Sequence, residues 1–153
     1  MNRRLITLLL GLFCLVCFCS AQTVRDKNNM TIGKVDSDGT VRNSSNMKIG
    51  SFDKNGTIRD ANNMKIGSID GSIIRDKNNM KIGSIESNGT VRDASNMKIG
   101  SVESNGTVRD ANNTKIGIVE SDGTVRDKSN MKVGSADGVN PTYAAVFFFF
   151  NRF

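Results

Sequence analysis

Pairs of carboxylates are the residues of this chain whose types and spacing could support chemistry. Asp36 and Asp38 lie two positions apart, as do Glu120 and Asp122. Such pairs can act as general acid and base or bind a hard cation. The equivalent place in another copy of the same sequence reads Asp-Lys-Asn-Gly at residues 53–56. A turn motif therefore explains these carboxylates better than a metal site or a catalytic pair does.

Other catalytic groups are missing from most of the chain. The sequence has no histidine, and its three cysteines, Cys14, Cys17 and Cys19, all lie within the first 21 residues. These residue types supply the commonest general base, the commonest transition-metal ligands and the thiol nucleophile. We therefore expect no catalytic, metal-binding or cofactor-binding residues, and we predict that the protein is not an enzyme.

Arginine followed by an acid is a second recurring feature, as in Arg92-Asp93, although Arg42 is followed by Asn43. Seven such arginines facing a central channel could form an anion-binding ring. Hydrogen bonds and ion pairs on the surface, between neighbouring hairpins, are the simpler interpretation. Exposed pairs of this kind contribute little to stability.

These arginines mark a 17-residue repeat, T-V-R-D-x-x-N-M-K-I-G-S-[IV]-[DE]-x-[ND]-G, which recurs seven times. One interval, between Arg59 and Arg75, is 16 residues, because the copy containing Gly71-Ser72 is one residue shorter. A repeated unit of this length predicts an architecture before it predicts a function. The arginines that mark the seven copies are Arg25, Arg42, Arg59, Arg75, Arg92, Arg109 and Arg126.

Each repeat reads as two short strands. Met97 and Ile99 alternate with polar residues, which is typical of a strand buried on one face. The odd spacing from Ile99 to Val102 would place these two side chains on opposite faces, so we expect a bulge or bend at Gly100 that returns both to the interior. Val, Met and Ile are the predicted interior residues.

Two turn signals separate the strands, at Asp93–Asn96 and at Ser104–Gly106. Asn, Asp and Gly tolerate the backbone angles of tight turns. Helix is disfavoured throughout, because no window has a 3.6-residue period. We predict an all-β fold after the N-terminal segment.

Neighbouring repeats must pack on one another, because one repeat has too few apolar side chains to fold alone. Two assemblies fit: a closed radial array of hairpins, and a β-solenoid. A solenoid would stack the arginines in one row at strand spacing, so the closed, flower-like array is favoured.

The N-terminal segment Met1–Ala21 reads as a signal peptide. Arg3 and Arg4 precede an apolar run, and small residues precede a cleavage site after Ala21. The run is shorter than a transmembrane helix needs, and the residues before the cysteines do not suit lipid attachment. We predict a periplasmic, surface-exposed or secreted protein with no membrane span after cleavage.

The C-terminal segment is apolar. Residues 22–138 form the seven-copy repeat domain, and residues 139–153 leave the repeat and include Phe147–Phe150. Four consecutive phenylalanines in water would favour aggregation. We predict that residues 139–153 form a closing strand of the same domain, buried on both faces.

The charged residues do not form a nucleic-acid site. Removal of Arg3 and Arg4 lowers the net charge from +6 to +4, and the remaining charges of both signs are spread through the repeats. The repeats contain one aromatic residue, Phe52, whereas nucleic-acid surfaces combine a basic stripe with stacking residues.

The combination of these features resembles the five-fold β-flower proteins of Bacteroidetes. It consists of an exported precursor, tandem G-T-V-R-D…N-M-K-I-G-S-[IV]-E units and a terminal A-A-V-F-F-F-F segment, and it covers Thr23 to Phe153. The resemblance implies hairpin petals around a pseudo-rotational axis and no established biochemical role. Seven copies of the unit, rather than five, leave the symmetry number open.

The function expected from the sequence is that of a structural or binding module of the cell envelope, which presents turn residues to an envelope protein, a glycan or an apolar ligand. The alternative is a carrier of a small apolar molecule or lipid. Its central cavity would be lined by Met97, Ile99 and their equivalents, with Phe147–Phe150 nearby.

Overall fold

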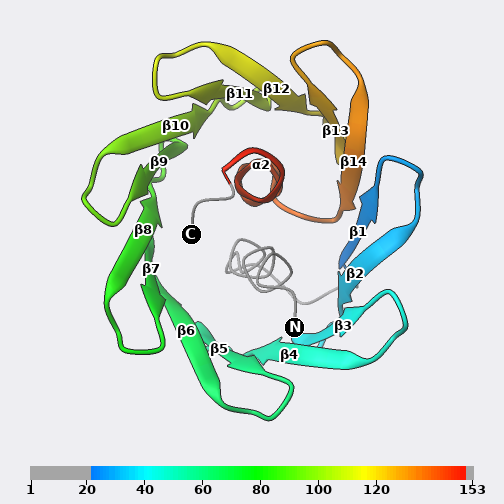
Figure 1. The fold of residues 1–153 in the computed structure, drawn as a ribbon, viewed down its shortest axis with the longest axis vertical. Coiled ribbons are helices and arrows are strands. Elements are labelled where there is room, and N and C mark those ends of the chain that lie inside the picture. The colour runs from blue at the N-terminus through cyan, green and yellow to red at the C-terminus, as the bar shows by residue number, and fades with distance from the viewer. Residues whose placement is uncertain (1–21, 151–153) are drawn as a thin grey trace.

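The computed structural model describes residues 22–150, which form a closed antiparallel barrel around a helix (Figure 1). The signal peptide predicted at Met1–Ala21 lies outside the described residues. The strands are β1 (Gln22–Asp26), β2 (Thr31–Val35), β3 (Thr40–Asn43), β4 (Lys48–Phe52), β5 (Thr57–Asp60), β6 (Lys65–Asp70), β7 (Ile73–Asp76), β8 (Lys81–Ile85), β9 (Thr90–Asp93), β10 (Lys98–Val102), β11 (Thr107–Asp110), β12 (Lys115–Val119), β13 (Thr124–Asp127) and β14 (Lys132–Asp137), and the helix is α2 (Pro141–Phe149).

Every strand pairs with its neighbours in sequence, and the ring is completed by the first and last strands. In the closing pair, β1 and β14 are antiparallel with Val24 opposite Ala136. The 14 strands therefore form seven hairpins in a closed array. This confirms the flower-like arrangement over the solenoid, and closure leaves no free sheet edge.

A bulge divides each repeat at the residue before the strand glycine. In the pairing of β9 with β10, Lys98 lies opposite Arg92 and Gly100 lies opposite Val91, so Ile99 is the extra residue. Ile99 packs against the core, and Val102 is buried in it. The predicted bulge is confirmed, and it places both side chains on the interior as expected.

Small β-branched residues form most of the interior. Val91, Val108 and Val125 are fully buried, at 0% exposure. The arginines that follow them are half-buried and form ion pairs along the barrel surface. Each odd-numbered strand has a buried Val or Ile next to a half-buried Arg, which is the period-two pattern of a sheet with one buried face.

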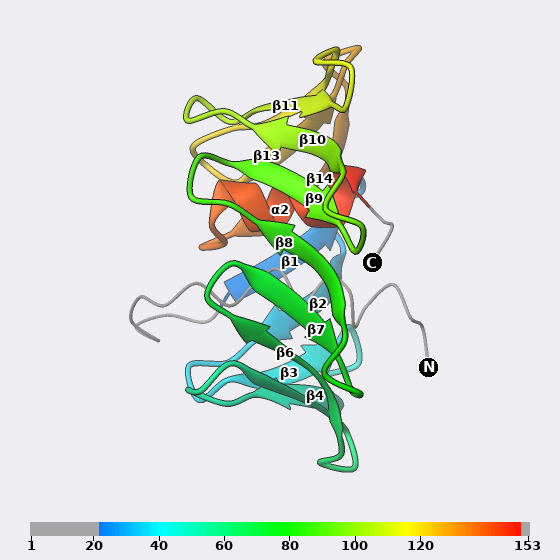
Figure 2. The same ribbon diagram turned by 90° about the vertical axis from the view of Figure 1, so that its left-hand side faces the viewer.

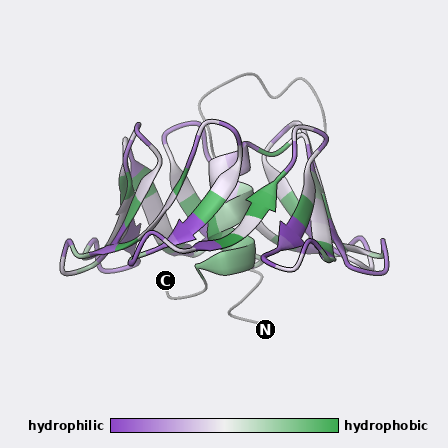
Figure 3. Ribbon diagram, turned by 90° about the horizontal axis from the view of Figure 1, so that it is seen from above, coloured by the Kyte–Doolittle hydropathy of each residue, from purple (hydrophilic) through white to green (hydrophobic). Residues whose placement is uncertain are grey.

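Two kinds of turn place two different rims at the ends of the barrel. The turns from odd to even strands splay outward at a common level and define the wide rim, at the lower edge in Figure 3. The turns from even to odd strands define the narrow rim. The wide rim comprises residues 26–31, 43–48, 60–65, 76–81, 93–98, 110–115 and 127–132; the narrow rim comprises residues 36–39, 53–56, 70–72, 86–89, 103–106, 120–123 and 137–140.

The C-terminal segment is a helix, not the closing strand that the sequence predicts. Helix α2 lies inside the barrel (Figures 1 and 2), where Ala144, Ala145 and Val146 are buried. The side chain of Asn140 caps its start by accepting from the backbone N–H of Thr142 at 2.9 Å, and Pro141 occupies the first turn. Because strands surround the helix, it needs no polar face, and so it lacks the amphipathic period that identifies surface helices.

Candidate binding surface

The methionines of the repeats lie on the outside of the wide rim. Their side chains are 61–66% exposed, which contradicts the prediction that Met97 and its equivalents line the interior. Large apolar side chains exposed at equivalent places are informative, because folding does not require them there. The exposed residues are Met30, Met47, Met64, Met80, Met97 and Met131.

Backbone geometry explains why these methionines point away from the core. Asp93 Oδ1 accepts a hydrogen bond from the backbone N–H of Met97 at 2.9 Å, and the backbone N–H of Asp93 donates to the Met97 carbonyl at 3.0 Å. Asn96, between them, has a φ of 67°. Met97 therefore belongs to a closed turn ahead of β10, and it lies outside the strand alternation. Asn is favoured at such a φ because its side chain tolerates the left-handed region.

Lysines accompany the methionines on the wide rim. Lys48, Lys65 and Lys98 each follow a methionine directly and are exposed. Lys81, which also follows a methionine, donates from Nζ to Asn96 Oδ1 of the next turn at 3.0 Å. The wide-rim segments contain nine lysines (Lys27, Lys48, Lys65, Lys77, Lys81, Lys98, Lys115, Lys128 and Lys132) and six aspartates (Asp26, Asp60, Asp76, Asp93, Asp110 and Asp127), a formal charge of +3.

The narrow rim has the opposite charge. Its segments contain one lysine, Lys54, and nine acids: Asp36, Asp38, Asp53, Asp70, Glu86, Glu103, Glu120, Asp122 and Asp137. None of its positions holds a methionine. The two rims of one barrel thus differ in both charge and apolar content.

Arginines connect the two rims along the outer face. Arg92 Nε donates to Glu86 Oε1 at 2.6 Å, and Arg92 Nη1 donates to the carbonyl of Asn96 at 3.1 Å. The prediction of ion pairs on the surface is confirmed, and the anion-binding ring facing a channel is wrong for these residues. The partner of Arg92 is Glu86, six residues earlier, whereas the adjacent Asp93 closes the wide-rim turn.

The carboxylate pairs of the narrow rim are occupied by turn interactions. Asp36 Oδ2 accepts from Arg42 Nε at 2.7 Å, and Asp38 Oδ1 accepts from the backbone N–H of Thr40 at 2.8 Å. The Arg42 hydrogen bond lowers the pKa of Asp36, and the Thr40 backbone hydrogen bond lowers the pKa of Asp38. Each carboxylate is held ionised by a local partner, as in a turn.

The second pair follows the same plan. Glu120 Oε1 accepts from Arg126 Nε at 3.1 Å, and Asp122 Oδ1 accepts from the backbone N–H of Thr124 at 2.8 Å. The Thr124 hydrogen bond lowers the pKa of Asp122. Within residues 22–150, no three acidic side chains come together in a group that could hold a metal ion.

The copies that depart from the repeat pattern differ in single contacts but retain a turn at each of the equivalent places. Asn43, which replaces the acid, accepts from the backbone N–H groups of Ser45 and Met47 at 3.0 Å through Oδ1, as the aspartates do. In the short copy, Asp70 lies opposite Ile73, so Gly71-Ser72 alone makes the turn. Among the described residues, Arg75 is the one repeat arginine without an acidic side chain within 4.0 Å.

Two phenylalanines of α2 and the adjoining Phe150 lie over the glycines of three strands. A Cβ placed on Gly117 would lie 2.5 Å from Phe149 Cε1, and one placed on Gly134 would lie 2.5 Å from Phe148 Cε1. The ring of Phe150 lies against Gly100 in the same way. Glycine is required at these positions because the rings occupy the space of a side chain.

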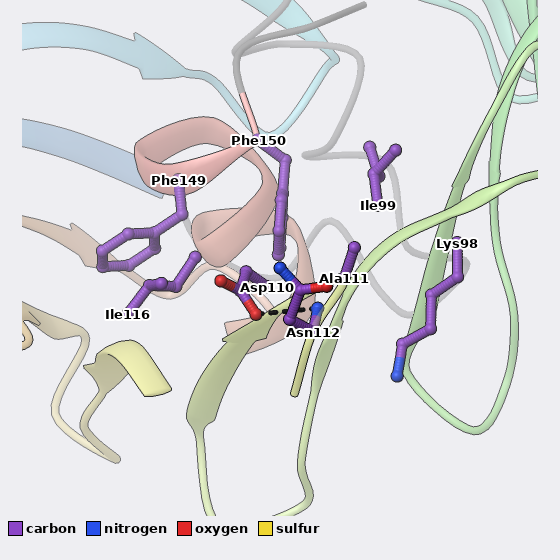
Figure 4. Close-up of a pocket in the computed structure, with 8 residues that line it drawn as sticks. All are labelled: Lys98, Ile99, Asp110, Ala111, Asn112, Ile116, Phe149 and Phe150. Carbon is purple, nitrogen blue, oxygen red and sulfur yellow. Dashed lines mark hydrogen bonds between the residues drawn. The ribbon is translucent and has the colours of Figure 1, made fainter. Parts of the chain in front are cut away.

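A cleft of about 270 Å³ lies beside the end of α2 and reaches the wide rim (Figure 4). Phe149, Phe150 and Ile116 provide its apolar wall, whereas Lys98 and Asn112 belong to the rim.

Inside the described range of the chain, no helix has the length and apolar character to cross a membrane.

The comparisons with known proteins identify the repeat. The family model described as 5-fold beta-flower protein matches residues 16–107 and again residues 53–152. Each match contains five of the seven repeat arginines, which explains how a five-fold model fits a seven-hairpin barrel in two overlapping places. No curated protein and no solved structure matches this chain. The two matches together span nearly all of the sequence, so the chain belongs to the 5-fold beta-flower protein family.

Proposed function

We propose that this protein is an exported, non-enzymatic binding module of the cell envelope, and that the wide rim is its binding surface. The observation that carries the proposal is the ring of six methionines, each more than 60% exposed at the same place in its turn. Exposed apolar side chains gathered on one rim are typical of interaction surfaces.

The rigidity of the turns supports this role. Each methionine follows an asparagine with φ of 62–67°, and an Asp or Asn side chain closes the turn behind it. The rim is therefore ordered before a partner arrives, which reduces the entropy lost on binding. The carboxylates that could support catalysis are bound within turns, so they favour a binding module over an enzyme.

Binding to isolated cell-envelope fractions tests the proposal. The exported protein should sediment with the envelope, and replacement of three rim methionines (Met47→Ser, Met64→Ser, Met80→Ser) should reduce the bound fraction. The matched control replaces exposed narrow-rim serines (Ser37→Ala, Ser87→Ala, Ser104→Ala) and should bind as the natural protein does. Equal binding by both variants would refute the wide rim as the binding surface.

A carrier of a small apolar molecule is the second candidate, and a specific observation favours it. Rings of α2 cover Gly117 and Gly134, and the ring of the adjoining Phe150 covers Gly100. At Gly50 and Gly67 the nearest described atoms instead belong to strand backbone. Positions of the barrel that are equivalent in sequence thus differ in what covers them. Mass spectrometry of the natively purified protein tests this candidate, which fails if no lipid or metabolite is released.

A further inference from the structure

We infer that the partner of the wide rim is an anionic lipid surface. The barrel would contact this surface through the wide rim, with the barrel axis perpendicular to the plane of the membrane. This inference rests on the proposed function and names the chemistry of the partner. Two kinds of residue carry it, the methionines and the lysines that alternate around the rim.

Methionine and lysine together match the interface of a bilayer. An exposed methionine can enter the boundary between headgroups and acyl chains, where its apolar side chain leaves water. The lysine beside it can reach a phosphate oxygen, since a flexible stem carries its ammonium group. Lys48, Lys65 and Lys98 are exposed next to such methionines.

Charge defines which rim faces the lipid. The wide rim carries a formal charge of +3, and the narrow rim carries nine acids against one lysine. Arginines pair with six of those acids, among them Asp36, Asp53 and Asp137. An anionic surface therefore attracts the wide rim and repels the narrow one, so the charge distribution orients the barrel.

Shape and symmetry favour a bilayer over a folded protein. The wide-rim turns splay to a common level (Figure 3), so they form a flat ring suited to a planar partner. The ring presents nearly the same residues seven times and contains no aromatic residue or arginine in its turn segments. Protein interfaces are enriched in methionine but also in aromatic residues and arginine, and they are depleted of lysine. The nine lysines of the wide rim therefore suit an anionic lipid surface better.

Vesicle sedimentation tests the inference. The exported protein is mixed with vesicles of phosphatidylcholine alone, or of phosphatidylcholine and phosphatidylglycerol in equal parts, at low and at high salt. We expect binding to the anionic vesicles, which weakens at high salt because ions screen the lysines. The triple lysine variant (Lys48→Gln, Lys65→Gln, Lys98→Gln) should bind about 100-fold more weakly, at roughly fivefold for each lysine. The methionine variant (Met47→Ser, Met64→Ser, Met80→Ser) should lose about tenfold or more.

Two narrow-rim variants are the controls, and all of the substituted positions are exposed, so circular dichroism should show every variant folded. Lys54→Gln removes the lysine of that rim and should bind normally. The triple variant Ser37→Met, Ser87→Met, Ser104→Met adds methionines there and should gain no binding. Failure of the natural protein to bind anionic vesicles, or equal losses in the rim variants and the controls, would overturn the inference.

The envelope experiment separates the two levels of the proposal. Envelope binding that depends on the rim methionines, together with no vesicle binding, would retain the wide rim as a binding surface and reject lipid as its partner. Loss of neither interaction in the rim variants would reject both.

Discussion

An alanine at Gly117 should destabilise the protein more than an alanine at Gly50. At both positions a Cβ would approach the carbonyl oxygen of the adjacent strand, at 2.6 Å from Arg126 at Gly117 and 2.5 Å from Arg59 at Gly50. At Gly117 it would also overlap the ring of Phe149. The two substitutions therefore share the backbone clash and differ in the aromatic one.

The aromatic clash can be assigned a magnitude. Overpacking of a filled interior costs about 1–3 kcal/mol, so we expect Gly117→Ala to be less stable than Gly50→Ala by about that amount. For a domain of this size this is a difference in melting temperature of about 3 °C or more for each kcal/mol. Thermal and denaturant unfolding followed by circular dichroism would measure it.

A double-mutant cycle identifies the contact. Phe149→Ala removes the ring that the new methyl group meets, so Gly117→Ala should cost less in the Phe149→Ala background, with a coupling energy of about 1 kcal/mol or more. The same cycle between Gly50 and Phe149 is the control and should be additive. Additive effects at Gly117, or equal costs of the two alanines, would refute the position of α2 inside the barrel.

Three further results are expected. Asn96→Gly should change the free energy of unfolding by less than about 0.5 kcal/mol, whereas Asn96→Val should lower it by about 1–2 kcal/mol because the backbone φ of residue 96 is 67°. Ala94→Val in the same turn is the control. Equal costs of valine at residues 94 and 96 would contradict the turn geometry. Local hydrogen bonds hold the pKa values of Asp36, Asp38 and Asp122 below the usual value of an aspartate in the folded protein, so the stability that they contribute is present above the unfolded pKa and is lost as the pH falls through the lowered values. Unfolding free energies between about pH 5 and pH 2 should therefore fall less in the double variant Asp38→Asn, Asp122→Asn than in the natural protein. Parallel curves would contradict this. Arg92→Met should cost less than about 1 kcal/mol in denaturant unfolding, since both members of its pair with Glu86 are about one-third exposed; a loss of several kcal/mol would show that the outer ion pairs hold the barrel closed.

Much of the barrel follows from the repeat itself. Asn and Gly at fixed positions predict the two turns, and the odd spacing between Ile99 and Val102 predicts the bulge, because each is a local consequence of backbone geometry. The packing of neighbouring repeats on one another follows from units that cannot fold alone, although this argument by itself also allows an open solenoid. The pairing of β1 with β14 completes that argument.

The helix could not be read from its sequence by periodicity. A helix that crosses the inside of a barrel is apolar on every side, so residues 141–149 lack the pattern that identifies a surface helix. Asn140-Pro141 was the available signal, since it combines a capping residue with proline in the first turn. The apolar run itself did correctly predict an interior position.

The methionines were misassigned because alternation was extended from the strand into the turn. Met97 lies two residues from Ile99, but the bulge and the closed turn interrupt the strand period between them. One copy of the repeat indicates that the methionine position is exposed, because Thr114 occupies it. The buried position equivalent to Val91, in contrast, is Val or Ile in all seven copies. A polar residue in one copy of a repeat indicates a position that does not require burial.

Oxidation footprinting of the methionines most directly tests the central claim that the wide rim is the binding surface. The protein without residues 1–21, free or bound to the envelope fraction, is exposed briefly to hydrogen peroxide, while Lys54 on the narrow rim is monitored in parallel by acylation. We expect the six exposed methionines to oxidise readily in the free protein and to be protected in the bound protein, with Lys54 equally reactive in both. Unchanged oxidation of the methionines together with protection of Lys54 would contradict the claim, because the narrow rim would then be the binding surface.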